Sequence, residues 1–332
     1  MKNILITGGL GFIGSHVVRL FCEKYKEYTV INLDKMTYAA NEELVEDFKK
    51  FSNYKLVKGD VSDKELVQSI FSENKIDGVI NLAAESHVDN SISGPEAFFT
   101  TNVMGTLNLV SIAKEMWSAS GDLYKNRFHH VSTDEVFGSL GAEGYFTEET
   151  AYAPNNPYSA SKASSDFVLR SFNKTFGLNS VITNCSNNFG QWQNDEKLIP
   201  TIIRKAIKGE AIPIYGNGSN IRDWLYVATH AEAIDVVFHK GKAGETYNIG
   251  ADNECTNLSL CHMICEVLNE VSPRAEGDYK DLIKFVTDRP GHDQRYAIDS
   301  SKLKKELGFS DQKDFKYCLR ETIEWYLKKW SV

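Results

Sequence analysis

The stretch Ile4-Leu5-Ile6-Thr7-Gly8-Gly9-Leu10-Gly11-Phe12-Ile13-Gly14 decides the fold of this chain. It begins with a short apolar run that is typical of a buried parallel strand. Behind the glycines, Val17, Leu20 and Phe21 continue the apolar pattern at helical spacing. Strand, glycine turn and helix in this order predict a dinucleotide-binding unit. Gly8 would permit the tight turn, Gly11 would let the backbone approach a pyrophosphate, and Gly14 would pack the helix on the strand.

A carboxylate follows the second predicted strand, which spans residues 29–33. Asp34 lies 20 residues after Gly14, where a carboxylate can accept hydrogen bonds from both ribose hydroxyls. The same charge repels a 2′-phosphate, so the sequence favours NAD over NADP. The amides and the dipole at the start of the first helix would bind the phosphates.

The regular alternation of elements sets the fold class. Further strands are expected at 56–61, 78–82, 128–132 and 181–183, separated by helices, one of which should run from about Pro95 to Trp117. Such alternation predicts an α/β protein with a Rossmann-type doubly wound parallel sheet. The pattern loosens after residue 190. We therefore expect an NAD-binding domain in 1–190, with some later segments interleaved, and a smaller mixed α/β lobe formed mainly by 191–332.

Two side chains near strand ends leave alternatives open. Asp60 could face the adenine amino group, or it could cap the helix that starts near Asp63. His87 follows small residues that let a cofactor lie close. It could contact cofactor or substrate, or it could make a structural hydrogen bond in a turn.

Two stretches carry proton-transfer chemistry. Tyr158 and Lys162 are four residues apart, which on a helix places both side chains on one face. A nearby ammonium favours the phenolate and lowers the phenol pKa, so the pair could take a proton from an alcohol while a hydride leaves the same carbon. Thr133-Asp134-Glu135 follows a predicted strand end, where ligands of such sheets bind. The alternatives are an exposed Tyr and Lys on an amphipathic helix and a solvated turn.

Composition excludes several classes of function. The net charge of −8 and the lack of a basic run argue against nucleic acid as a partner. The sequence shows neither a signal peptide nor an apolar run long enough to span a membrane. The six cysteines are scattered, which indicates reduced thiols in a cytoplasmic protein. Cys261 and Cys265 would share a helix face near His262, but a zinc site needs more ligands, so no metal is expected.

Taken together, these stretches resemble the extended short-chain dehydrogenase/reductases and, within them, the hexose 4,6-dehydratases. The glycine turn and the Tyr158–Lys162 pair fit the whole superfamily, whereas the Thr-Asp-Glu triplet is similar to that of the 4,6-dehydratases. Four further stretches are similar to those with which the thymidine-diphosphate branch handles its sugar nucleotide: 184–190, 197–200, 222–225 and 288–293.

The resemblance implies a hydro-lyase that converts dTDP-glucose into dTDP-4-keto-6-deoxyglucose with NAD as a recycled cofactor. Tyr158 would take the C4 hydroxyl proton, Lys162 would tune Tyr158 and hold the nicotinamide ribose, and Thr133 would hydrogen-bond the C4 oxygen. Glu135 would remove the C5 proton, and Asp134 would protonate the departing C6 hydroxyl. The hydride taken from C4 would return to C6.

The resemblance also implies two binding sets and a homodimer. The cofactor-binding residues are Gly8, Gly11, Phe12, Ile13, Gly14, Asp34, Lys35, Thr37, Asp60, Val61, Leu82, Ala83, Ala84, Ser86, Tyr158, Lys162 and Asn188. The substrate-binding residues are Ser86, His87, Thr133, Asn187, Lys197, Leu198, Pro213, Tyr215, Arg222, Asn257, Arg289 and His292. Subunits would pair through the helices that start near Pro95 and Tyr158. These helices carry apolar residues beyond one core-facing stripe, namely Phe98, Phe99, Phe167, Val168 and Phe172.

Three departures from the family pattern concern the substrate pocket. Asn90 stands where arginine is usual, residues 191–195 replace a proline-containing segment, and residues 226–230 lack a usual acidic pair. Two groups of alternatives therefore stay open. One comprises a UDP-glucose 4,6-dehydratase, a 4-epimerase or a decarboxylase of the same fold. The other is a catalytically silent NAD-binding protein, which the complete set of catalytic residues disfavours.

Overall fold

The computed structural model describes residues 2–288, 293–310 and 313–331. Its centre is a seven-stranded sheet in the order β10-β6-β5-β4-β1-β2-β3, and every neighbouring pair is parallel. The strands are β1 (Lys2–Thr7), β2 (Tyr28–Asp34), β3 (Tyr54–Lys58), β4 (Gly78–Asn81), β5 (Arg127–Thr133), β6 (Ser180–Cys185) and β10 (Thr246–Ile249). The strand order reverses direction between β1 and β4, which is where doubly wound sheets bind ligands.

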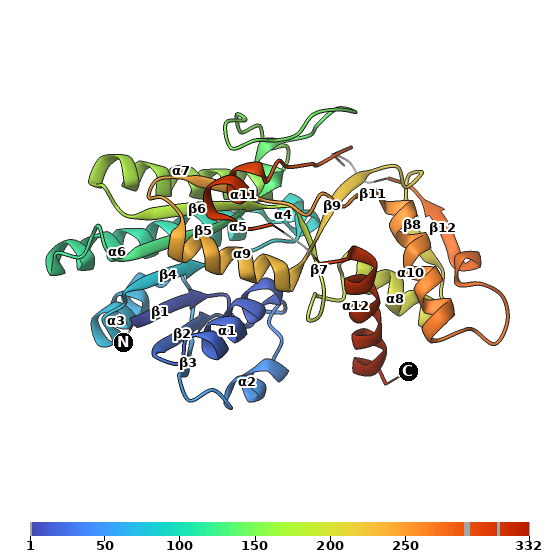
Figure 1. Cartoon of the computed structure of the whole chain (residues 1–332), viewed down its shortest axis with the longest axis horizontal. Helices are drawn as coiled ribbons and strands as arrows, with labels where there is room; N and C mark the ends of the chain where they lie inside the picture. The colour runs from blue at the N-terminus through green and yellow to red at the C-terminus, as the bar shows by residue number, and fades with distance from the viewer. Residues whose placement is uncertain (1, 289–292, 311–312, 332) are drawn as a thin grey trace.

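Helices cover both faces of this sheet (Figure 1). One face is covered by α1 (Phe12–Lys24), α9 (Val227–Lys240) and α11 (Ser301–Leu307), whose apolar residues pack with one set of strand side chains. The other face is covered by α3 (Lys64–Asn74), α6 (Gly105–Ser120) and α7 (Pro157–Phe176). Because both faces of the sheet are covered, the central strands are buried on both sides, and β4 and β6 are buried along their whole length. The α/β Rossmann-type fold is therefore confirmed.

The helix expected over Pro95–Trp117 is wrong in one respect. A short α5 (Pro95–Phe98) and α6 are joined by a π-helical segment, Phe99–Met104. In this segment Asn102 is buried, and its side-chain amide hydrogen-bonds to both backbone groups of Glu85 and to Ser161 Oγ. These polar contacts accompany the wider turn, and no apolar periodicity in the sequence indicates them.

The apolar residues expected beyond the core-facing stripe of these helices divide into three groups. Phe98 is only 2 % exposed, so it belongs to the core, because its ring packs toward α7 beside Tyr158. Val168 and Phe172 are partly buried against the core. Phe99 and Phe167 remain exposed.

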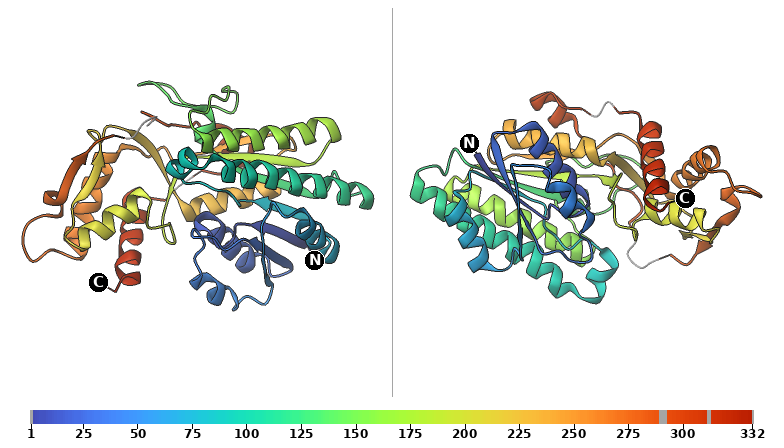
Figure 2. Two further views of the ribbon diagram at one scale, coloured as in Figure 1. Left: turned by 180° about the vertical axis from the view of Figure 1, so that it is seen from behind. Right: turned by 90° about the horizontal axis from the view of Figure 1, so that it is seen from below.

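A smaller lobe lies beside one end of the sheet and contains the C-terminus, whereas the N-terminus lies in the larger domain (Figure 2). Its strands are β7 (Asn187–Phe189), β8 (Ile212–Tyr215), β9 (Ile221–Tyr226), β11 (Glu254–Thr256) and β12 (Ile283–Val286), paired as β11-β9-β7 and β12-β8. Its helices are α8 (Leu198–Ile207), α10 (Asn257–Val271) and α12 (Phe315–Lys329), which share one core. Within the described ranges, no helix is long and apolar enough to cross a membrane.

Candidate active site

The main cleft opens at the carboxyl ends of the central strands and has a volume of about 330 Å³. All the predicted cofactor-binding residues line it, and so do all five predicted catalytic residues. Of the predicted substrate-binding residues, Ser86, Thr133, Asn187 and Lys197 also line it. Residues that are far apart in the sequence therefore converge on one site.

The glycine turn has the geometry that a dinucleotide requires. Gly8 has a φ of +71°, which favours glycine. A Cβ on Gly14 would lie 2.1 Å from the carbonyl oxygen of Gly8. Gly14 therefore packs on the turn itself, whereas we had expected it to pack on the strand. A Cβ on Gly11 would meet only that same oxygen, at 3.2 Å, which leaves the cleft side of Gly11 open. Helix α1 starts directly after Gly11, which has no side chain that could cap its amides.

Asp34 is held rigidly at the end of β2. Its Oδ2 accepts a hydrogen bond from the Leu10 amide at 2.9 Å and its Oδ1 one from the Met36 amide at 2.8 Å. Burial raises the pKa of Asp34, and these two backbone hydrogen bonds act in the opposite direction. Each oxygen keeps a second lone pair for a ribose hydroxyl, so the residues present fit a dinucleotide.

Of the two alternatives left open for Asp60, the role of helix cap is excluded. Asp63, not Asp60, caps α3 by accepting a hydrogen bond from the Leu66 amide. Asp60 instead pairs with Lys35 at 2.7 Å in the cleft wall. Burial favours the protonated form of Asp60, but hydrogen bonds from Lys35 and Ser62 hold its pKa below the usual value. Its contact with adenine stays a prediction.

Helix α7 presents Tyr158 and Lys162 to the cleft. The helix begins with a capping box between Asn156 and Ser159, and Gly177 ends it in the left-handed conformation. Lys162 Nζ donates a hydrogen bond to the Val131 carbonyl at 2.8 Å. The expected lowering of the Tyr158 pKa by Lys162 is wrong for this structure. Burial raises the pKa of Tyr158 well above its usual range, the negative charge of Glu135 adds to this, and a hydrogen bond with Thr133 opposes it.

Thr133 ends β5 and caps the 3-10 turn that starts at Asp134, and the two carboxyl groups of the triplet have different environments. Asp134 is 2 % exposed, and its Oδ2 has no hydrogen-bond partner among the described residues. Burial, followed by the negative charge of Glu135, raises the pKa of Asp134 well above its usual range. The environment of Asp134 therefore favours its protonated form, which is the form that the predicted acid needs.

A second, smaller cavity adjoins the first and shares Glu135 with it. Arg222 lines this cavity and is held by its surroundings. Its guanidinium donates to the carbonyls of Ile221 and Asp293 and lies 4.3 Å from the ring centroid of Tyr296. Asp293 ends the stretch 288–293 that the resemblance assigned to the sugar nucleotide, although it was not named as a site residue. Sequence reasoning missed Tyr296, and its closeness to that stretch was the available signal.

Several predicted substrate residues lie elsewhere. His87 caps α4 (Val88–Ser93) by accepting a hydrogen bond from the Asn90 amide, so it has the structural role that we had kept open. The residues that line neither cavity are His87, Leu198, Pro213, Tyr215 and Asn257. Arg289 and His292 lie outside the described residues. In the described ranges no group of His, Cys, Asp and Glu could hold a metal ion.

A Rossmann-type sheet whose cleft contains a Tyr-x-x-x-Lys pair defines a class of protein, the extended short-chain dehydrogenase/reductases. Comparisons with known proteins agree. The family model described as GDP-mannose 4,6 dehydratase matches residues 5–322. The chain therefore belongs to the GDP-mannose 4,6 dehydratase family.

Within this family, the curated relatives have one name. The dTDP-glucose 4,6-dehydratase of Salmonella typhimurium is 50 % identical, with 98 % of this chain and 92 % of the relative covered. The crystal structure of Bacillus anthracis dTDP-glucose 4,6-dehydratase in complex with NAD has a TM-score of 0.88 and 42 % identity and covers 100 % of this chain and 98 % of that chain. The solved UDP-glucose 4-epimerase of Thermotoga maritima has a TM-score of 0.87 but only 26 % identity, with 99 % and 100 % covered.

Proposed function

We propose that this protein is a dTDP-glucose 4,6-dehydratase that uses NAD and yields dTDP-4-keto-6-deoxyglucose. The observation that carries this proposal is that one cleft is lined by a Tyr158–Lys162 pair and by two adjacent carboxyl groups, Asp134 and Glu135. Burial raises the pKa of Asp134, which favours its role as the acid. Oxidation needs only the pair, whereas elimination of water also needs a base and an acid. The identity of 46–50 % with dTDP-glucose 4,6-dehydratases over nearly the whole chain supports the same conclusion.

The residues have distinct roles in this reaction. Tyr158 takes the proton of the C4 hydroxyl, and Thr133 hydrogen-bonds the C4 oxygen. Glu135 then removes the C5 proton, and Asp134 gives its proton to the departing C6 hydroxyl. Bound NAD supplies a hydride acceptor and a positive charge. Because burial raises the Tyr158 pKa, the charge of Lys162 is needed to favour the phenolate.

The acid and base distinguish this reaction from those of relatives with the same fold. A 4-epimerase needs the cofactor site, Tyr158 and Lys162, but has no water to eliminate. Asp34 at the ribose end of the cleft favours NAD over NADP, because its carboxylate would repel a 2′-phosphate.

The proposal is tested by incubating the purified protein with dTDP-glucose and, in parallel, with UDP-glucose. The expected result is an alkali-sensitive absorbance of a 4-keto-6-deoxy product with dTDP-glucose. Deuterium placed at C4 should appear at C6 of the same molecule. An epimerised sugar, product from UDP-glucose only, or loss of the label to solvent would each contradict the assignment.

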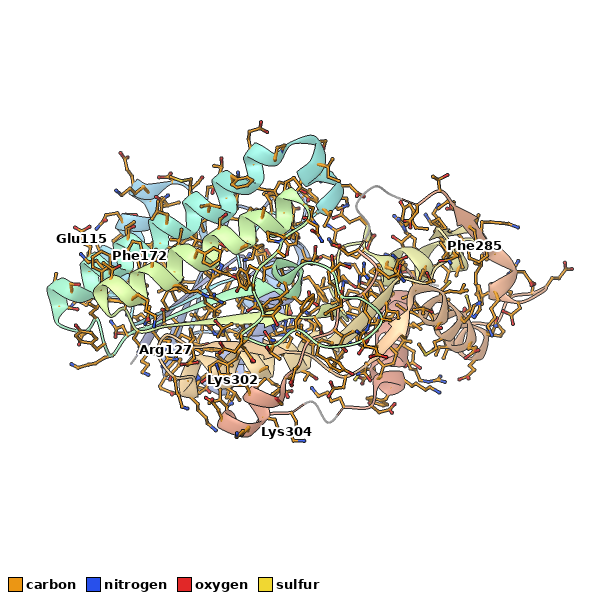
Figure 3. All side chains as sticks on the ribbon, turned by 90° about the horizontal axis from the view of Figure 1, so that it is seen from above. Glu115, Arg127, Phe172, Phe285, Lys302 and Lys304 are labelled. Carbon is orange, nitrogen blue, oxygen red and sulfur yellow. The ribbon has the colours of Figure 1, made fainter. Side chains whose placement is uncertain are left out.

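We also propose a cytoplasmic homodimer. The support comes from exposed apolar side chains along the α5–α6 and α7 helices. Phe99 is 41 % exposed, Met104 48 % and Phe167 54 %. Helices α6 and α7 lie side by side along one face of the molecule (Figure 3). The six free cysteines agree with a reducing compartment. Light scattering that finds a stable monomer at micromolar concentration would contradict the dimer.

A further inference from the structure

A buried carboxylate lies directly behind the catalytic pair. Asp166 is on α7, one helical turn after Lys162, and its side chain has no solvent exposure. Its Oδ2 accepts hydrogen bonds from Ser132 Oγ at 2.8 Å and from the Tyr152 hydroxyl at 2.9 Å. The reaction steps assigned above do not use Asp166. A buried carboxylate with no assigned role needs a physical explanation, because burying a charge is costly unless it is compensated.

One helical turn before Asp166, the ammonium of Lys162 is a second buried charged group. Lys162 is 4 % exposed, and its Nζ donates to a backbone carbonyl, which carries only a partial charge. Burial lowers the pKa of Lys162, and the main influence that opposes this is the negative charge of Asp166. Residues four apart on a helix are neighbours on its surface, so the two side chains face the same side.

The other titratable groups around Lys162 cannot serve as its counter-charge. His130 reaches it from β5, and burial lowers the pKa of His130 to about 4, so this ring is neutral. Cys185 reaches it from β6, and burial raises the pKa of its thiol to about 12. Burial also raises the pKa of the Tyr158 phenol, which favours its uncharged form. In the part of the chain that the structure describes, Asp166 is therefore the negative group that offsets Lys162.

Hydrogen bonds fix the position of this carboxylate. Ser165 Oγ donates to the Lys162 carbonyl, so it accepts from His130 Nε2 at 3.1 Å. This assigns the hydrogen to Nε2, which also lies 3.3 Å from Asp166 Oδ1. The other ring nitrogen then accepts from Asn81, whose oxygen accepts in turn from Thr7 next to the glycine turn. A chain of polar contacts through His130 and Asn81 thus connects Asp166 with Thr7, at the start of the glycine turn.

We propose that Asp166 is a positioning residue, whose carboxylate keeps the buried ammonium of Lys162 charged and beside Tyr158. This inference rests on the proposed role of Lys162 in the reaction, but its first test needs no substrate.

That test compares Asp166→Asn with a matched control, Asp235→Asn. Asp235 on α9 is also buried, accepts from a tyrosine hydroxyl (Tyr25, 2.8 Å) and lies 2.9 Å from a histidine nitrogen of His239. Lysine labelled with carbon-13 at Cε reports the titration of Lys162 by NMR, and Lys162→Met assigns the signal. In Asp166→Asn the Lys162 titration should move to lower pH by roughly 1–3 units, the usual effect of an opposite charge at close range. Asp235→Asn should leave the titration where it is in the native protein.

The second arm measures kcat as a function of pH with dTDP-glucose. The alkaline limb of the profile should move to lower pH in Asp166→Asn only, in step with the Lys162 titration. An unmoved Lys162 titration overturns the inference, whatever the activity. A shifted titration with no turnover in the native protein would instead contradict the proposed function and leave the counter-charge in place.

If Asp166→Asn does not fold, Asp166→Ser removes the same charge with a smaller side chain. The Lys162 titration should then move to lower pH in Asp166→Ser, whereas Asp166→Glu, which keeps the charge, should leave it near its native position. A Lys162 titration that is the same in Asp166→Ser as in the native protein shows that the inference is wrong.

Discussion

The two sides of the active-site cleft are built in different ways. The dinucleotide side is made of short contiguous stretches at strand ends, such as residues 7–14 after β1 and Asp34 at the end of β2. The substrate side is made of single residues from distant segments, and Glu135, Arg222 and Tyr296 meet there from three parts of the chain. Local geometry therefore fixes the first side, whereas only tertiary packing brings the second together.

The largest effect is expected from Gly14→Ala, on the dinucleotide side. The new Cβ would lie 2.1 Å from the backbone oxygen of Gly8, and backbone cannot move aside as a flexible side chain can. We expect complete loss of the NAD that denaturation releases from the purified protein. Gly141→Ala is the control, because nothing lies within 4 Å of its Cβ position. Stoichiometric NAD in Gly14→Ala would show that the turn tolerates a side chain.

Glu135→Gln separates oxidation from elimination where the two sides meet. The variant keeps the size of the side chain but removes the base. We expect NADH absorbance on mixing with dTDP-glucose, while product forms at least ~100-fold more slowly, the low end for general-base catalysis. Tyr158→Phe should instead suppress the NADH signal. If Glu135→Gln dehydrates the substrate at the native rate, Glu135 is not the base that removes the C5 proton.

The larger domain should also be the more acid-sensitive region. His230 on α9 is buried, its ring bonds to Asn188, and burial lowers its pKa to about 3. Because the unfolded state takes up the proton near pH ~6.5, the stability that neutral His230 contributes is full above that pH and is lost below it. Between pH ~7 and ~5 this amounts to roughly 2 kcal/mol of unfolding free energy, or ~30-fold in the unfolding equilibrium.

Urea unfolding at both pH values measures this effect. The loss of stability on acidification should be smaller in His230→Asn than in the native protein by about that amount. The control, His262→Asn, changes a half-buried histidine on α10 of the smaller lobe and should show the native loss. Equal losses in all three proteins would refute the prediction.

The smallest effect is expected on the substrate side. Arg222→Ala removes a guanidinium that lines the second cavity, and losing one contact to a charged group costs roughly 1.5–3 kcal/mol. The KM for dTDP-glucose should rise about tenfold or more, since ~1.4 kcal/mol is tenfold. Arg320→Ala, which breaks an ion pair with Glu270 on the protein surface, is the control. An unchanged KM in Arg222→Ala would make its hydrogen bonds to backbone carbonyls purely structural.

The contrast between the two sides also explains what could be predicted from the sequence. Most of the predicted cofactor residues lie at or just after a strand end, and the periodicity of the chain reveals the strand ends. The fold, the glycine turn and Asp34 were therefore accessible. The residues predicted to be catalytic could be named because their spacing on α7 and after β5 is itself local.

Features that depend on burial or on distant partners were not accessible. The sequence places Lys162 near Tyr158 but does not show that the phenol is buried beside Glu135, which reverses the direction of the pKa shift. The π-helical segment depends on Asn102 meeting Glu85 and Ser161. Tyr296 joins the site only because Arg222 stacks on its ring.

Strand β10 and helix α9 come after residue 190, yet they complete the large sheet and one of its faces. A chimaera that takes its smaller lobe from a relative therefore cannot be made with a single junction. A chimaera joined once at residue 190 would take its edge strand from one parent and the strand that it pairs with, β6, from the other. The exchange needs separate junctions around α9, β10 and α11, so that the host keeps these three elements and the relative supplies β8, α10 and α12.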